Sequence, residues 1–192
     1  MDERTKETLQ ALAALIVVIL FAIFIFQNSH LVTELIQGYG LVGLLIASVI
    51  ANASIFLPVP IDILIFAVAA QLDSFIELFA VAFVTGFGAA IGEMTAYIMG
   101  LLGVKTFEKA KRSEFIQINV IRDKLSKSGV IFIFLGALTP FPFDIIGITA
   151  GLIKYDLKKF FVAALLGKFV RYLIIGIAAL YGVSFVREFF LF

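Results

Sequence analysis

The chain has 192 residues, of which 62% are hydrophobic and only 15% charged, and its mean hydropathy is +1.11. Soluble domains are nearer half apolar and a quarter charged, so this composition excludes a water-soluble enzyme core and a disordered chain. The net charge of +1 gives no field to steer nucleic acid, and the absence of cysteine excludes disulfides and cysteine-based metal or redox sites. The single histidine, His30, offers no metal site alone. We therefore expect a single-domain, all-α polytopic membrane protein with no cofactor, no metal and no nucleic-acid partner.

Apolar and polar stretches alternate along the chain and predict its membrane elements in order. A transmembrane helix that stays attached as an anchor is expected first, because about 20 apolar residues cross a bilayer. It is followed by a polar loop, a proline-interrupted apolar stretch, a second span, a basic segment, another interrupted stretch and a last span. These elements cover residues 9–26, 27–40, 41–70, 78–103, 104–128, 129–153 and 160–182.

All four prolines lie in the middle of the two interrupted stretches. Proline lacks a backbone N–H and its ring clashes with the preceding turn, so each helix is expected to break there. The remaining pieces are short for spanning helices. We therefore predict two re-entrant hairpins, whose backbone must be satisfied by protein or by a wet cavity. The tips of these hairpins are Pro58 and Pro60 in the first, and Pro140 and Pro142 in the second.

Basic residues predict the orientation of the chain in a plasma membrane. Residues 1–8, 104–128 and 154–159 hold 12 of the 15 lysines and arginines, whereas the loops at 27–40 and 71–77 hold none. The positive-inside rule then places the N-terminus and the 104–128 segment in the cytoplasm. The first hairpin would enter the membrane from outside and the second from the cytoplasm.

The 104–128 segment also carries apolar residues at a nearly helical spacing, namely Phe115, Ile118, Ile121 and Leu125. With its flanking basic residues it would form an amphipathic helix on the anionic inner leaflet. A solvated connector is an open alternative.

Two parts of the chain repeat one pattern. Pro58-Val59-Pro60-Ile61-Asp62 recurs 82 residues later as Pro140-Phe141-Pro142-Phe143-Asp144, and Gly92-Glu93 with Tyr97 is echoed by Gly167-Lys168 with Tyr172. Because the two copies enter the membrane from opposite sides, this is an inverted-topology repeat. Such repeats are typical of transporters, whose sites lie at the midplane between broken helices.

Five charged residues are predicted at membrane depth, and they are the candidate substrate- or proton-binding residues: Asp62, Glu93, Asp144, Lys168 and Arg171. Each costs about 2.5–3.5 kcal/mol in hydrocarbon, so they should face one another or a wet cavity. The two aspartates would either cap their half-helices or bind substrate and protons. Glu93 and Lys168 would form a buried pair that fixes packing or take part in the site. Arg171 is a candidate phosphate ligand.

Small residues in the two later spans favour close helix contact rather than binding. They are Gly86, Gly88, Gly92 and Gly167.

These motifs together resemble the DedA/VTT (SNARE-associated Golgi protein) superfamily, most nearly its YqaA-like branch, from about residue 40 to 182. The resemblance rests on the Pro-x-Pro-x-Asp hairpin, the glycine span ending in Tyr97 and Gly100, the second hairpin ending in Ala150-Gly151, and Leu166-Gly167-Lys168…Arg171-Tyr172. It implies two opposed re-entrant hairpins, movement of phospholipids or polyprenyl phosphates across the bilayer, and dependence on the proton-motive force. Asp62 matches the acidic residue of the family's first hairpin.

The chain departs from the family pattern in two places. Residues 50–53 contain no glutamate, and Ala137 and Phe143-Asp144 stand where the family carries arginines around the second hairpin's proline. Those arginines would hold a phosphate, and Lys168 and Arg171 are candidates to replace them.

The leading hypothesis is a lipid flippase, scramblase or small-solute transporter that is not an enzyme. Its partners would be membrane lipids and protons or another coupling ion, and an oligomer is compatible with the pattern. Protonation of Asp62 or Asp144 would switch access between leaflets. One alternative is an intramembrane aspartyl protease, although Phe143 stands where such proteases carry Gly-x-Gly before the aspartate. Another is a non-transporting assembly factor that acts through the 104–128 segment.

Overall fold

The computed structural model describes residues 20, 23, 24, 27, 29–53, 61–102, 112–140 and 142–190. In these ranges every regular element is a helix, which confirms the predicted all-α class. The helices are α2 (Ser29–Ala53), α3 (Ile61–Ala69), α4 (Phe75–Leu101), α5 (Arg112–Leu138), α6 (Phe143–Leu152) and α7 (Leu157–Phe190). Most of the predicted first span at 9–26 lies outside the described residues.

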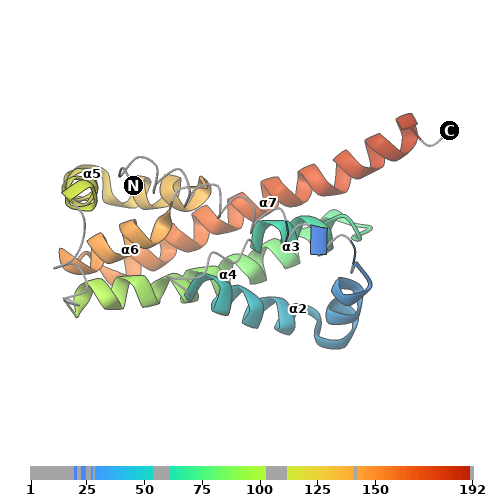
Figure 1. Cartoon of the computed structure of the whole chain (residues 1–192), viewed down its shortest axis with the longest axis horizontal. Coiled ribbons are helices and arrows are strands. Elements are labelled where there is room, and N and C mark those ends of the chain that lie inside the picture. Colours follow the sequence, from blue (N-terminus) through green and yellow to red (C-terminus); the bar gives the residue numbers. More distant parts are fainter. Residues whose placement is uncertain are drawn as a thin grey trace, which may run out of the picture.

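Two helices are long and apolar enough to cross a membrane, namely Phe75–Leu101 and Leu157–Gly182. They correspond to the spans predicted at 78–103 and 160–182. α4 begins directly after Ser74, whose hydroxyl accepts a hydrogen bond from the Glu77 backbone N–H at 3.2 Å. The two long helices pack against each other, and the C-terminal part of α7 extends beyond α4 (Figure 1).

The other four helices that the structure describes pack around this pair. α2 packs on α4 and α5 packs on α7, whereas α3 packs on α7 and α6 on α4. α2 and α3 lie toward one end of the α4–α7 pair, and α5 and α6 lie toward the other (Figure 1). Among the short apolar helices, Gly38–Ala53 and Phe143–Leu152 have fewer residues than a bilayer span needs.

Glycines set how closely the helices approach. A Cβ atom on Gly88 would lie 2.6 Å from the Leu45 carbonyl oxygen, and one on Gly92 would lie 2.6 Å from the Val49 carbonyl oxygen. On α7, a Cβ on Gly167 would lie 2.5 Å from a carbonyl oxygen of α5. These distances are too short for a side chain, so α2 and α5 approach the spans at backbone contact.

The polar loop predicted at 27–40 is wrong, because α2 already begins at Ser29. Gly40 has φ 53° and ψ −142°, a conformation open to glycine, and it separates two helical pieces. The polar residues before the glycine are compatible with a helix. Polarity and glycine mark a kink between helices at this position.

The basic segment is helical where the structure describes it, and α5 is kinked at Ser128 (φ −146°, ψ 42°), the end of the predicted 104–128 segment. Two of its apolar residues, Ile121 and Leu125, are buried in a core cluster with Ile133 and Phe160. This part of the amphipathic face therefore packs on the protein. The side chains of Phe115 and Ile118 lie outside the described residues, so the leaflet contact stays a prediction.

Candidate functional site

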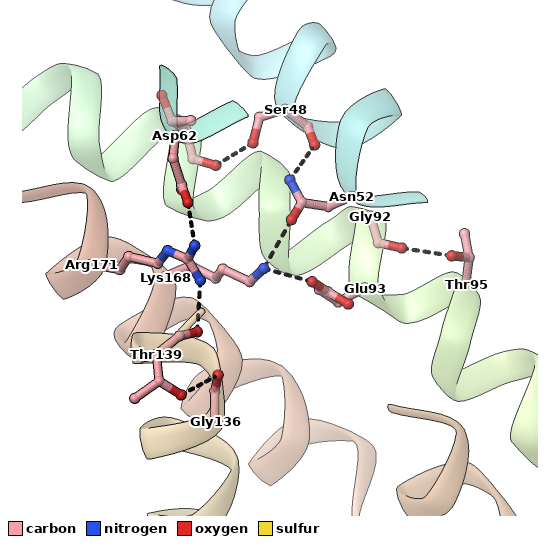
Figure 2. Close-up of polar contacts among 11 residues, drawn as sticks. Ser48, Asn52, Asp62, Gly92, Glu93, Thr95, Gly136, Thr139, Lys168 and Arg171 are labelled. Atoms are coloured by element: carbon pink, nitrogen blue, oxygen red, sulfur yellow. Dashed lines mark hydrogen bonds and ion pairs between the residues drawn. The ribbon is translucent and has the colours of Figure 1, made fainter. Parts of the chain in front are cut away.

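A buried ion pair joins the two long helices. Lys168 Nζ on α7 lies 2.7 Å from Glu93 Oε1 on α4, with 9% and 4% of the two side chains exposed. The same ammonium donates a hydrogen bond to Asn52 Oδ1 on α2 at 2.9 Å (Figure 2). The pair that the repeat relates is therefore in contact. We call Glu93, Lys168 and Asn52 the inner cluster.

Neighbouring groups hold the inner cluster in place. Asn52 Nδ2 donates to the Ser48 carbonyl at 2.9 Å, and Ser48 Oγ donates to the Thr85 carbonyl at 2.6 Å. The first bond lies within α2, and the second ties α2 to α4. Lys168 Nζ also lies 5.4 Å from the centre of the Phe143 ring, within cation–π range, which brings in the start of α6. Lys168 thus contacts α2, which precedes the first proline pair, and α6, which follows the second.

A second ion pair lies nearer the surface. Arg171 on α7 pairs with Asp62, in the first turn of α3, and donates a hydrogen bond from Nη1 to the Thr139 carbonyl at 2.7 Å (Figure 2). The Arg171 and Asp62 side chains are 17% and 36% exposed. We call these three groups the outer cluster, and through it one guanidinium links α3 to the end of α5.

The Thr139 carbonyl is free to accept this bond for a local reason. α5 ends at Leu138, and the last carbonyls of a helix have no partner within it. The chain continues through Pro140 and Pro142, which have no N–H to offer. Both prolines are exposed between α5 and α6, whereas Pro58 and Pro60 lie outside the described residues.

Asp144 and one oxygen of Glu93 stand apart from these contacts. Asp144 lies half-buried in the first turn of α6, and no hydrogen bond or ion pair joins its side chain to the described residues. It interacts electrostatically with Lys168 and with Glu93. Glu93 Oε2 is buried and has no hydrogen-bond partner in the part of the chain that the structure describes.

All five predicted charges therefore belong to one region, but the two aspartates do not form a dyad. Asp62 pairs with Arg171, and no hydrogen bond links it to Asp144 among the described residues. No cluster of three or more potential metal-binding side chains occurs in the described ranges. The region offers cationic donors for an anion and carboxylates for a proton or a cation.

Sequence reasoning missed Asn52 and the Thr139 carbonyl. Asn52 was detectable as an amide within the apolar run 41–57, since a polar group at that depth needs a partner. The carbonyl had no sequence signal of its own, because its role depends on where α7 crosses the end of α5. Phe143 was identified only as the residue before Asp144.

Two long apolar helices with one ion pair buried between them, and with the other described helices packed around them, are typical of an all-helical membrane-associated protein. The family model of the VTT domain matches residues 59–185, and the chain belongs to this family of DedA-type membrane-associated proteins. No curated protein and no solved structure matches the chain.

Proposed function

We propose that the protein is a lipid flippase or scramblase of the DedA/VTT type, which moves phospholipids or polyprenyl phosphates between leaflets. The observation that carries the proposal is the bridge made by Arg171 between Asp62 on α3 and the Thr139 carbonyl after α5. This partly exposed guanidinium lies between the α2–α3 pair and the α5–α6 pair. It is positioned to bind a phosphate and, on doing so, to change how the two pairs are held together.

The packing of the helices supports the inverted repeat on which this proposal depends. In each half, the helix before the proline pair packs on the half's own span, as α2 does on α4 and α5 on α7. The helix after the proline pair packs on the span of the other half, as α3 does on α7 and α6 on α4. The α2–α3 pair and the α5–α6 pair lie toward opposite ends of the spans α4 and α7 (Figure 1). This exchange is what two re-entrant hairpins of opposite orientation would give.

Headgroup exchange at the outer cluster gives a mechanism. A lipid phosphate can form two parallel hydrogen bonds with a guanidinium and would compete with Asp62 for Arg171. Once displaced, Asp62 no longer holds α3 to α7, and the first hairpin can move relative to the second. Protonation of Asp62 or Asp144 would favour the same rearrangement, which would link transport to a proton gradient.

The experiment is transbilayer movement of labelled lipid in vesicles that contain the purified protein. Arg171→Gln is expected to slow it by roughly 10- to 100-fold, the equivalent of about 1.5–3 kcal/mol for a charged hydrogen bond to the phosphate. Asp62→Asn cannot regain the charge that re-forms the pair with Arg171, so it is expected to abolish transport. Asp144→Asn is also expected to abolish transport. Arg122→Gln and Asp123→Asn are matched controls, since both side chains are exposed on α5. Wild-type rates in Arg171→Gln and in both aspartate variants would refute the proposal.

The same vesicles separate the two alternatives. A protease needs two carboxyls that share a proton, and Asp62 is instead paired with Arg171. An assembly factor acting through 104–128 would lose function when that segment is deleted and keep it in the aspartate variants.

The orientation can be tested directly because the natural chain has no cysteine. Single cysteines at the exposed positions Asp73 and Lys158 leave the charged clusters intact. We propose that Asp73 faces outward and Lys158 the cytoplasm in the plasma membrane, together with the N-terminus and 104–128. A membrane-impermeant maleimide should then label intact cells only at position 73. Labelling at position 158 alone would invert the topology. Membership of the YqaA-like branch stays a prediction.

A further inference from the structure

Two acids and one base meet around the inner cluster. Glu93 comes from α4, Asp144 from α6 and Lys168 from α7. Lys168 is 2.7 Å from Glu93 and interacts electrostatically with Asp144, while the two carboxyls also interact with each other. With every group ionised, this trio would carry one uncompensated negative charge in an apolar interior, which is costly.

The surrounding helices supply no further cation in the part of the chain that the structure describes. Arg171, the other basic residue near Glu93, is held by Asp62 of α3 and by the Thr139 carbonyl after α5. α2 contributes Asn52 and Ser48, which are neutral. Tyr172 on α7 is fully buried and is neutral as a phenol. The extra negative charge therefore has no counter-charge from these helices.

The unpartnered oxygen of Glu93 adds to the cost of a second negative charge in the trio. Glu93 Oε2 is buried without a hydrogen-bond partner among the described residues, and only 4% of the side chain is exposed. Buried carboxylate oxygens are normally satisfied, because an unmade hydrogen bond to a charged group is expensive. A proton on either carboxyl removes the excess negative charge of the trio, and a proton on Asp144 does so while Lys168 stays paired with Glu93.

We propose that Glu93, Asp144 and Lys168 form a binding site for one proton, which is occupied at neutral pH. The proton belongs to the trio as a whole: whichever carboxyl Lys168 pairs with is ionised, and the other is protonated. If the Lys168 ammonium moved from Glu93 toward Asp144, the proton would move from Asp144 to Glu93. The position of the proton would then depend on how α6 packs on α4. The outer cluster keeps the headgroup role, so the two functions are separate. The inference goes beyond the proposed function, because the proton site does not depend on which species is transported.

Infrared spectroscopy of the purified protein at pH 7 tests this site without a transport assay. The carbonyl stretch of a protonated carboxylic acid should be present in the wild type. It should disappear in both Glu93→Gln and Asp144→Asn, because either change leaves one acid facing one base. Asp123→Asn, a matched control, should keep it, since Asp123 is exposed on α5.

Lys168→Met makes the opposite prediction. Both carboxyls would then be protonated, because neither has a base beside it. The band should therefore be about twice as strong as in the wild type. Asp144→Asn removes no hydrogen bond or ion pair among the described residues, so it remains informative even if the other variants fold poorly. Absence of the band in the wild type, or its persistence in Asp144→Asn, would overturn the proposal.

Discussion

Removing the ammonium of the inner cluster should be strongly destabilising at neutral pH and much less so in mild acid. In Lys168→Met, Glu93 loses a partner at 2.7 Å and stays almost fully buried. The folded variant avoids an unpaired buried carboxylate by binding one more proton than the wild type. Placing a proton at pH 7 on a glutamate of ordinary pKa, about 4.3, costs about 4 kcal/mol at 1.36 kcal/mol per unit. This agrees with the roughly 3–5 kcal/mol measured when one member of a buried pair is removed.

The pH dependence gives this prediction its sign. The folded variant holds the extra proton and the unfolded chain at pH 7 does not, so lowering the pH favours the folded variant. At pH 5 the same proton costs only about 1 kcal/mol, so most of the destabilisation relative to wild type should disappear. A double variant, Glu93→Leu with Lys168→Met, removes both charges and should recover most of the stability, as apolar replacements of buried pairs do.

The assay is thermal unfolding followed by circular dichroism at pH 7 and pH 5, since the chain has no tryptophan to report by fluorescence. A loss of about 4 kcal/mol corresponds to roughly 8–16 °C in Tm for a chain of this size. Lys124→Met is the matched control, because Lys124 is exposed on α5, and it should change stability by less than about 0.5 kcal/mol. A pH-independent loss, or a double variant as unstable as Lys168→Met, would refute the reasoning.

Two further variants test the packing around the site. Gly151→Ala should prevent close contact of α6 with α4, because its Cβ would overlap the Tyr97 carbonyl oxygen, whereas Gly38→Ala meets nothing within 4 Å and should be tolerated; equal melting temperatures would contradict this packing. Tyr97→Phe removes the hydroxyl that donates to the Tyr155 carbonyl and should cost about 1–3 kcal/mol, as expected for an orphaned acceptor. A thermal melt equal to wild type would show that water replaces this bond.

Local chemistry made much of the fold predictable. The long apolar runs indicated α4 and α7, because only length and hydropathy are needed to recognise a membrane span. The break before α6 was predicted from Pro140 and Pro142, since the loss of backbone donors is a property of those residues alone. The helical start of α2 has no such signal, because its residues are polar, as in a loop, and Gly40 only kinks the chain.

The site was predictable in its members and only partly in its pairings. The repeat related Glu93 to Lys168, and depth in the membrane singled out all five charges. That Arg171 reaches Asp62, while Asp144 has no ion-pair partner in the described ranges, depends on how α3 and α6 cross the spans. Such crossings are long-range packing results with no local signal. Asn52 was missed because it carries no charge, although its neutral amide completes the inner cluster.

The central claim is best tested by transbilayer lipid movement in vesicles of the wild-type protein, measured with and without a pH gradient. The account predicts that the protein accelerates the movement of a phosphate-bearing lipid over protein-free vesicles, and that a gradient changes the rate. A rate equal to that of protein-free vesicles under both conditions would contradict it.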